Sequence, residues 1–195
     1  MEGIKKVLKT IVLDFREGGP KTRVSYLILG FGQLCRGQIV KGIAFLLSEV
    51  AFIAYLIGFG ARYFSKLSTL GTTLTKKTGR TTVYGDNSFL ILLFGILTVF
   101  IIVFFLVIWY LNIQDNHEAE RLLKAGKKLP GNKEVLGSLL DKHFDKTLLA
   151  LPVTGIFLFT VLPIAFMICV AFTNYDYNHQ APTNLFTWVG FENFR

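Results

Sequence analysis

Three long apolar runs, separated by polar stretches, organise the chain. The clearest covers residues 89–111, which contain no charged residue and nineteen Leu, Ile, Phe or Val side chains. At about −0.3 to −0.6 kcal/mol each, these side chains favour insertion into a bilayer by roughly 6 to 11 kcal/mol, an upper bound because the values apply to a helix centre. We therefore predict a membrane-spanning helix at 89–111.

The other two runs are less uniform. Residues 43–61 hold ten such side chains but also Glu49, and an acidic residue near the centre of a span costs on the order of 3 kcal/mol. Residues 148–172 hold fifteen, together with Pro152 and Pro163, whose missing backbone donors must be compensated by neighbouring groups. Both runs are close to or above the roughly 20 residues that cross a bilayer as a helix, so we predict two further spans.

A fourth apolar segment, residues 24–35, would be only about 18 Å long as a helix. This is too short to cross the membrane and is typical of an interfacial or re-entrant piece. The fold class that follows is an all-α membrane protein with three transmembrane helices plus interfacial helices. We expect an N-terminal region 1–42, a first loop 62–88, a second loop 112–147 and a tail 173–195.

The distribution of Lys and Arg predicts the orientation. Eight precede residue 43, five lie in the first loop, seven lie in the second loop and one follows residue 172, so the two sides carry fifteen and six. Because cytoplasmic loops are enriched in Lys and Arg, we expect a cytoplasmic N-terminus and an extracytoplasmic C-terminal tail, in a multi-pass protein of the cell membrane. The first loop, with five cations, is the weakest support for this orientation.

The loops carry little recognisable chemistry. The first is rich in threonine and reads as an irregular exposed segment. The second is broken by Pro130-Gly131, after which Leu136, Leu139, Leu140 and Phe144 follow helical spacing. This amphipathic part could lie on the inner membrane surface, and an ordinary connecting helix packed on the protein explains the spacing equally well.

Composition excludes several classes of function. Hydrophobic residues make up 52% of the chain, above the 45 to 50% usual for soluble domains, and the net charge of +8 is divided among the gaps between apolar runs instead of forming a nucleic-acid-binding stripe. His117, His143 and His179 are scattered, without the paired spacing of a zinc site or catalytic triad. We expect no enzyme activity, no cofactor, no metal and no nucleic-acid partner.

Glu49 is the one charge inside a predicted span, and its neighbours one helical turn away are apolar. Its partner must come from another helix or from water, or the carboxyl must be protonated. A structural interhelical hydrogen bond is the leading interpretation, and a substrate or ion contact or no buried role are the alternatives. Small residues follow one stripe beside it, which suits close helix packing. The candidate contact residues are Ser48, Glu49, Ala51 and Gly58.

Recognisable motifs begin at the third span. They are Leu-Ala-Leu-Pro-Val at 149–153, Phe-Thr-Val-Leu-Pro at 159–163, Ala-Phe-Thr-Asn-Tyr-Asp at 171–176 and Val-Gly-Phe-Glu-Asn-Phe at 189–194. With these motifs the chain resembles the membrane-spanning permease subunits of bacterial binding-protein-dependent ABC sugar importers. The segments 32–42 and 178–182 are similar to the maltose and maltodextrin branch. The motif positions are Pro163, Phe172, Thr173, Asn174, Tyr175, Gly190, Glu192 and Asn193.

The resemblance implies an importer in which two permease subunits form the path, two cytoplasmic ATPase subunits drive it and an external binding protein delivers the sugar. The family's coupling loop and most of its sugar-contacting helices lie beyond this region, so the resemblance identifies no sugar-binding residue here. It implies the N-terminal part of a longer permease. Three helices cannot enclose an oligosaccharide path, so we expect no transport by this chain alone. The alternative is a small membrane scaffold or accessory subunit with no transport role.

Overall fold

A computed structural model describes residues 11–78, 80–140, 144–180 and 184–195. The chain divides into two compact units. The first contains residues 1–53 and 103–148, and the second contains residues 54–102 and 149–195. The sequence signals at residues 1–10, His143 and the end of the 178–182 motif lie outside the described residues.

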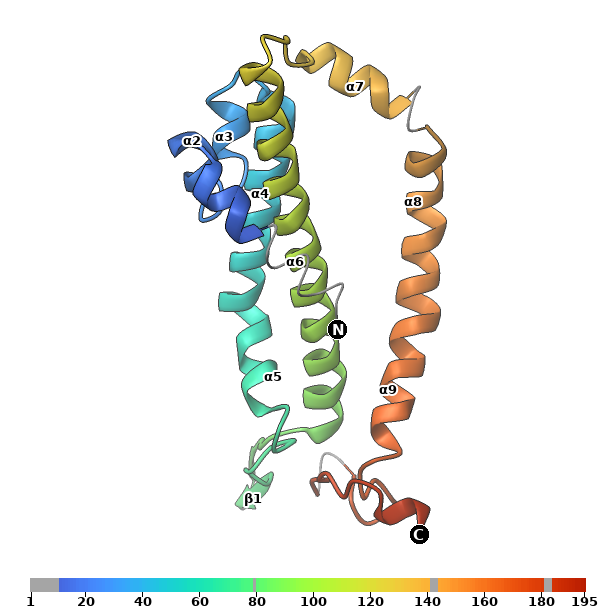
Figure 1. Cartoon of the computed structure of the whole chain (residues 1–195). Helices are drawn as coiled ribbons and strands as arrows, with labels where there is room; N and C mark the ends of the chain where they lie inside the picture. Colours follow the sequence, from blue (N-terminus) through green and yellow to red (C-terminus); the bar gives the residue numbers. More distant parts are fainter. Residues whose placement is uncertain (1–10, 79, 141–143, 181–183) are drawn as a thin grey trace. The chain divides into compact units, whose positions relative to one another are not determined.

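The first unit is helical. A helical stretch over residues 11–17 precedes α2 (Pro20–Val24), α3 (Phe31–Leu34), the first part of α4 (Ile39–Tyr55), the last part of α6 (Ser88–Lys124) and α7 (Asn132–Leu140). Figure 1 shows α2 and α3 in blue beside the yellow-green end of α6. The aromatic rings of Phe52 and Phe105 stack with centroids 3.9 Å apart, which joins α4 to α6.

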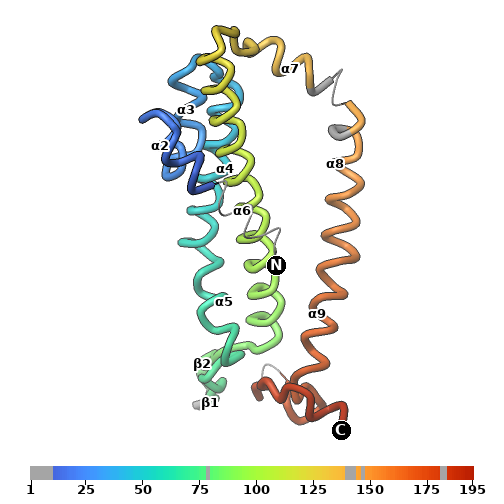
Figure 2. Tube along the Cα trace, in the orientation of Figure 1, coloured from blue at the N-terminus to red at the C-terminus, as the bar shows by residue number. Residues whose placement is uncertain are grey.

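The second unit continues both helices and adds the third. Its elements are the π-helical turn Leu56–Gly60, α5 (Ala61–Lys66), β1 (Lys76–Thr78), β2 (Thr81–Val83), the start of α6, most of α8 (Phe144–Ile156), the π-helical turn Phe157–Val161, α9 (Leu162–Val170) and the 3₁₀ turn Glu192–Phe194. Figure 2 follows this path along the chain. Its buried core consists of Leu70, Ile91, Leu92, Ile96, Phe166 and Phe186. Phe186, from the tail, is fully buried in that core.

Among the described residues three helices are long and apolar enough to cross a membrane, namely Ile39–Lys66, Ser88–Lys124 and Leu148–Val170. Their number agrees with the three expected spans. The second helix continues beyond the predicted end at residue 111 as far as Lys124, because the polar face of this extension is buried, as described below. The third ends at Val170, since Ala171 and Phe172 begin a turn.

One expectation needs correction, and one segment is described in more detail by the structure. The first loop is not wholly irregular, because α5 extends to Lys66 and β1 pairs antiparallel with β2, with Lys76 opposite Val83 and Lys77 opposite Thr82. The fold is mostly helical, as expected, with one short hairpin in this loop. The segment 24–35 is divided between the end of α2 and α3, because the chain turns between them and Gly30 adopts φ +80°. Its interfacial placement stays a prediction. An L-residue with a side chain rarely adopts this left-handed conformation.

Candidate functional sites

A polar face on the last part of α6 forms the centre of the first unit. Asn112, Asn116 and Glu120 recur every four residues, which places them on one side of the helix. The side chains of Asn112 and Asn116 are fully buried. Buried carboxamides are stabilising only when their donors and acceptors are paired, so the groups that face them matter.

Gln33 of α3 supplies much of that pairing. Its Nε2 donates to Asn112 Oδ1 at 3.2 Å and to Asp115 Oδ2 at 3.1 Å, and its Oε1 accepts from Asn116 Nδ2 at 2.9 Å. The Asn112 amide nitrogen in turn donates to the carbonyl of Ser25 at 2.8 Å. The turn between α2 and α3 is therefore fixed to α6 through side-chain amides.

Arg36 closes the same network. Its guanidinium donates to Asn116 Oδ1 at 2.6 Å and to Thr22 Oγ1 at 2.5 Å, and lies 3.5 Å from Glu120 Oε2. The Glu120 carboxylate also accepts from the backbone N–H of Gly19 at 2.9 Å. Burial lowers the pKa of Arg36, while Glu120 opposes that shift. We call the set Thr22, Gln33, Arg36, Asn112, Asn116 and Glu120 the amide cluster.

Two glycines allow the amide cluster to form. A Cβ at Gly30 would overlap the backbone carbonyl of Gly42, and a Cβ at Gly32 would overlap the side-chain oxygen of Asn116. Larger residues at either position would push the α2–α3 turn away from α4 and α6. The glycines therefore act through close backbone approach.

Glu49 lies on α4 in this first unit. Its Oε2 accepts a hydrogen bond of 2.9 Å from the backbone N–H of Leu29, a buried residue in the turn between α2 and α3. This partner could not be predicted from the sequence, because a backbone amide has no residue-type signature. Whether the carboxylate has a further role in a complete assembly stays a prediction.

The small-residue stripe begins on α4 and continues to Gly58 in the π-helical turn Leu56–Gly60. Ala51 and Gly58 are exposed, and a Cβ added at Gly58 would meet no atom within 4 Å. The hydroxyl of Ser48 donates to the carbonyl of Phe45 in its own helix at 2.7 Å. The proposed role of the stripe in helix packing stays a prediction.

Seven of the eight family-motif positions, all except Pro163, follow the end of α9. Thr173 forms an antiparallel bridge with Trp188, and the side-chain oxygen of Asn174 accepts from the backbone N–H of Thr187 at 2.6 Å. Asn193 Nδ2 donates to the carbonyls of Ala171 at 3.0 Å and Thr173 at 2.7 Å. The two motifs at 171–176 and 189–194 thus fold onto each other. We call this arrangement the tail knot.

Most of the remaining motif positions also lie in or beside the tail knot. Gly190 has φ +62° and donates its N–H to the carbonyl of Phe172 at 3.1 Å. The ring of Phe172 contacts that of Phe191 edge to face, with centroids 5.3 Å apart. The other positions are Tyr175, whose ring contacts Phe186, Glu192, which begins the 3₁₀ turn, and Pro163, which follows the π-helical turn at the start of α9.

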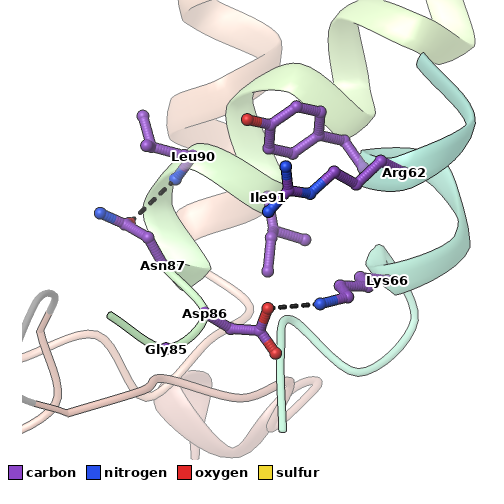
Figure 3. Close-up of a pocket in the computed structure, with 8 residues that line it drawn as sticks. Arg62, Lys66, Gly85, Asp86, Asn87, Leu90 and Ile91 are labelled. Carbon is purple, nitrogen blue, oxygen red and sulfur yellow. Dashed lines mark hydrogen bonds and ion pairs between the residues drawn. The ribbon is translucent and has the colours of Figure 1, made fainter. Parts of the chain in front are cut away.

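A small pocket lies where α5 meets the start of α6 (Figure 3). Asp86 lines it and accepts from Lys66 Nζ at 2.5 Å and from the backbone N–H groups of Thr72 and Thr73 at 3.0 and 3.2 Å. Burial alone would raise the pKa of Asp86, but these hydrogen bonds outweigh burial and hold it well below its usual range. The pocket measures about 120 Å³, below the roughly 300 Å³ of small ligand sites. It is too small for an oligosaccharide.

The chemistry of these sites is hydrogen bonding and charge pairing. Among the described residues no group of His, Cys, Asp and Glu is arranged to hold a metal ion. His117 lies 3.5 Å from Asp14, and His179 lies 2.8 Å from Asp176. Neither pair adjoins a hydroxyl or thiol nucleophile in the contacts described, so the geometry favours positioning of helices and loops.

Comparison with known proteins agrees with the resemblance to sugar-transport permeases. The chain is 28% identical over 175 residues to the maltodextrin transport system permease protein MalC of Streptococcus pneumoniae, which covers 89% of this chain and 38% of that protein. The chain is homologous to permease proteins of sugar transport systems. It is 32% identical over 169 residues to the galactooligosaccharides transport system permease protein GanP of Bacillus subtilis, covering 86% of this chain and 38% of GanP.

A third relative is the maltodextrin transport system permease protein MdxF of Bacillus subtilis, 31% identical over 170 residues, with 86% of this chain and 37% of MdxF covered. The chain therefore spans less than two fifths of the length of these relatives. They are transport permeases and not enzymes, which supports the expectation of no enzyme activity. No family model matches the chain, and no solved structure matches it.

The amide cluster was not predicted from the sequence. The signal was present, because Asn112, Asn116 and Glu120 follow one helix face directly after an apolar span. The partners could not be predicted, since Thr22, Gln33 and Arg36 lie some 80 to 100 residues away in the chain.

Proposed function

We propose that this chain is part of the membrane permease subunit of an ABC importer for maltodextrin or a related oligosaccharide. The observation that carries the proposal is the similarity to maltodextrin and galactooligosaccharide permeases over 86 to 89% of the chain. Three helices of membrane-spanning length and composition support it. The partners of such a subunit are a second permease subunit, cytoplasmic ATPase subunits and an extracytoplasmic sugar-binding protein.

The proposed orientation has a cytoplasmic N-terminus, in a multi-pass protein of the cell membrane. It is supported by the fifteen Lys and Arg residues on one side of the three spans against six on the other. In this orientation the amide cluster lies on the cytoplasmic side of its spans and the tail knot lies outside. A reporter fused after Arg195 tests it, because alkaline phosphatase is active only outside the cytosol. An inactive alkaline phosphatase fusion, together with an active fusion of a reporter that works only in the cytosol, would reverse the orientation.

We propose structural roles for the amide cluster and the tail knot, based on the segments that each of them joins. The amide cluster holds the α2–α3 turn against α6, and the tail knot fixes the exit of the third span. Only 6% of the apolar window of the first and third spans is buried, so these helices leave wide surfaces for lipid and for further helices. The oligosaccharide path is then formed with helices from the remainder of the permease and from its partner subunit.

Uptake of labelled maltodextrin tests the proposal. A strain that lacks its maltodextrin permease but keeps the ATPase and binding protein receives either this chain or a chain extended to the full length of the relatives. We expect uptake with the extended chain and none with residues 1–195 alone. No uptake with a stably inserted extended chain would favour the scaffold alternative, and uptake with this chain alone would contradict the need for further helices.

A further inference from the structure

The hairpin between the first two spans carries an unusual concentration of free cations. Residues 67–87 contain Lys76, Lys77 and Arg80, and their acidic residue, Asp86, is paired with Lys66 of α5. The side chains of all three cations are exposed. Among the described residues none of the three has a side-chain hydrogen bond or ion pair. The hairpin therefore presents three uncompensated positive charges.

Apolar side chains share this surface. Leu74, Val83 and Tyr84 are 51%, 62% and 80% exposed. Lys76 lies opposite Val83 in the ladder, and residues directly opposite in an antiparallel pair point to the same face. A hollow of about 520 Å³ is lined by Leu74, Lys76, Val83 and Tyr84 together with Thr72, Thr73 and Gly85. A cation beside exposed aliphatic and aromatic groups suits an amphiphilic ligand.

The base of the hairpin is fixed to the ends of two spans. The N–H of Asp86 donates to the carbonyl of Thr73 at 2.7 Å, and the N–H of Gly85 donates to Thr75 Oγ1 at 3.1 Å. The Asp86 carboxylate holds Lys66, the last residue of the first span, two residues before the second span begins at Ser88. These bonds hold the base of the hairpin close to the ends of both helices.

The short length of the hairpin places its cations near the lipid headgroups. Each strand has three residues, or about 10 Å of reach. The headgroup layer extends roughly 5 to 8 Å beyond the hydrocarbon, and charges interact over a Debye length of about 8 Å at physiological salt. Lys76 and Lys77, at the base of the hairpin, therefore lie within reach of headgroup phosphates.

We propose that this hairpin docks onto anionic phospholipid headgroups beside the first two spans. Lys76, Lys77 and Arg80 pair with the phosphates, while Val83 and Tyr84 enter the interfacial layer. The proposal needs the two spans but neither the transport function nor the orientation, since both ends of this loop lie at one face of the membrane. It also gives a physical reason for basic residues in a loop that the Lys and Arg count assigns to the outside.

A polarity-sensitive fluorophore on the hairpin tests the proposal. The probe site is T81C in a C35S/C169S background, because Thr81 is exposed and two residues from Val83 on the same face of β2. The full chain is placed in nanodiscs of phosphatidylcholine alone or mixed with phosphatidylglycerol. We expect a blue shift, and quenching by headgroup-labelled lipid, that grow with phosphatidylglycerol and are lost at high salt.

Two variants separate charge from fold. K76Q/K77Q/R80Q should lose the phosphatidylglycerol-dependent signal, and the charge-preserving K76R/K77R should keep it. Hydrogen exchange at Thr72 and Thr73 reports whether the base of the hairpin is intact in each variant. With an intact base, a wild-type signal independent of phosphatidylglycerol would overturn the proposal. So would a probe that is shielded only when copurifying membrane proteins are added, since the surface would then bind protein.

Discussion

The indole nitrogen of Trp188 donates a hydrogen bond of 2.9 Å to the backbone carbonyl of Leu67. The two residues are 121 positions apart in the chain, and the bond joins the segment after the third span to the end of the first. Close by, the N–H of the buried Phe186 donates to Ser88 Oγ at 3.2 Å. The tail knot is therefore bonded to the ends of the first two spans, and Trp188 can report on its integrity.

Loss of Asn193 should loosen the tail knot. N193A removes the two hydrogen bonds to the carbonyls of Ala171 and Thr173, and we expect a local loss of about 1 to 3 kcal/mol. In a W109F background the emission of Trp188 should shift to the red at a lower denaturant concentration. N178A is the matched control, because Asn178 is exposed. Equal midpoints for N193A and N178A would contradict the prediction.

The amide cluster should be sensitive to single truncations. N116A leaves Arg36 Nη1 and Gln33 Oε1 without the buried partner that each has now, and an unsatisfied buried group costs about 1 to 3 kcal/mol. We expect a lower unfolding temperature for the chain in detergent micelles. N178A again serves as the control, and a N116A chain as stable as N178A would argue against a structural role for the cluster.

Two substitutions at Glu49 separate its role as a hydrogen-bond acceptor from the effect of its negative charge. E49A leaves the Leu29 N–H unpaired, which should cost about 1 to 3 kcal/mol, while E49Q keeps an acceptor oxygen and should lose less. Thermal unfolding in micelles distinguishes the two variants. Equal losses would show that the negative charge matters beyond its hydrogen bond, whereas full assembly and uptake with E49Q in a complete permease would exclude a role for the charge.

The hydrogen bonds that Asp86 accepts should keep the base of the first loop folded at low pH. Because the pKa of Asp86 is lowered in the folded chain, its contribution to stability is fully present above the unfolded value of about 3.9 and is lost as the pH falls toward the folded value. Hydrogen exchange at the Thr72 and Thr73 amides should therefore stay protected to a pH below the usual carboxyl range. D86N should lower this protection at neutral pH as well. Protection lost already near the ordinary Asp pKa would contradict the assignment.

The spans were predictable because insertion depends on the sum of side-chain transfer energies along a continuous run. Residues 89–111 alone fixed the second span, and no tertiary contact was needed to find it. Its extension to Lys124 was not predictable, since polar residues 112–124 read as a loop until Gln33 and Arg36 are seen to satisfy their buried amides.

By itself the sequence determined the membrane class, the three spans and, through its motifs, the relationship to sugar permeases. The tertiary structure decided which polar groups meet. Glu49 pairs with a backbone N–H of Leu29, and Asn193 pairs with two carbonyls of the 171–173 turn. Hydrophobicity is additive along the chain and can be read residue by residue, but a hydrogen bond depends on distance and angle between groups that only the folded chain brings together.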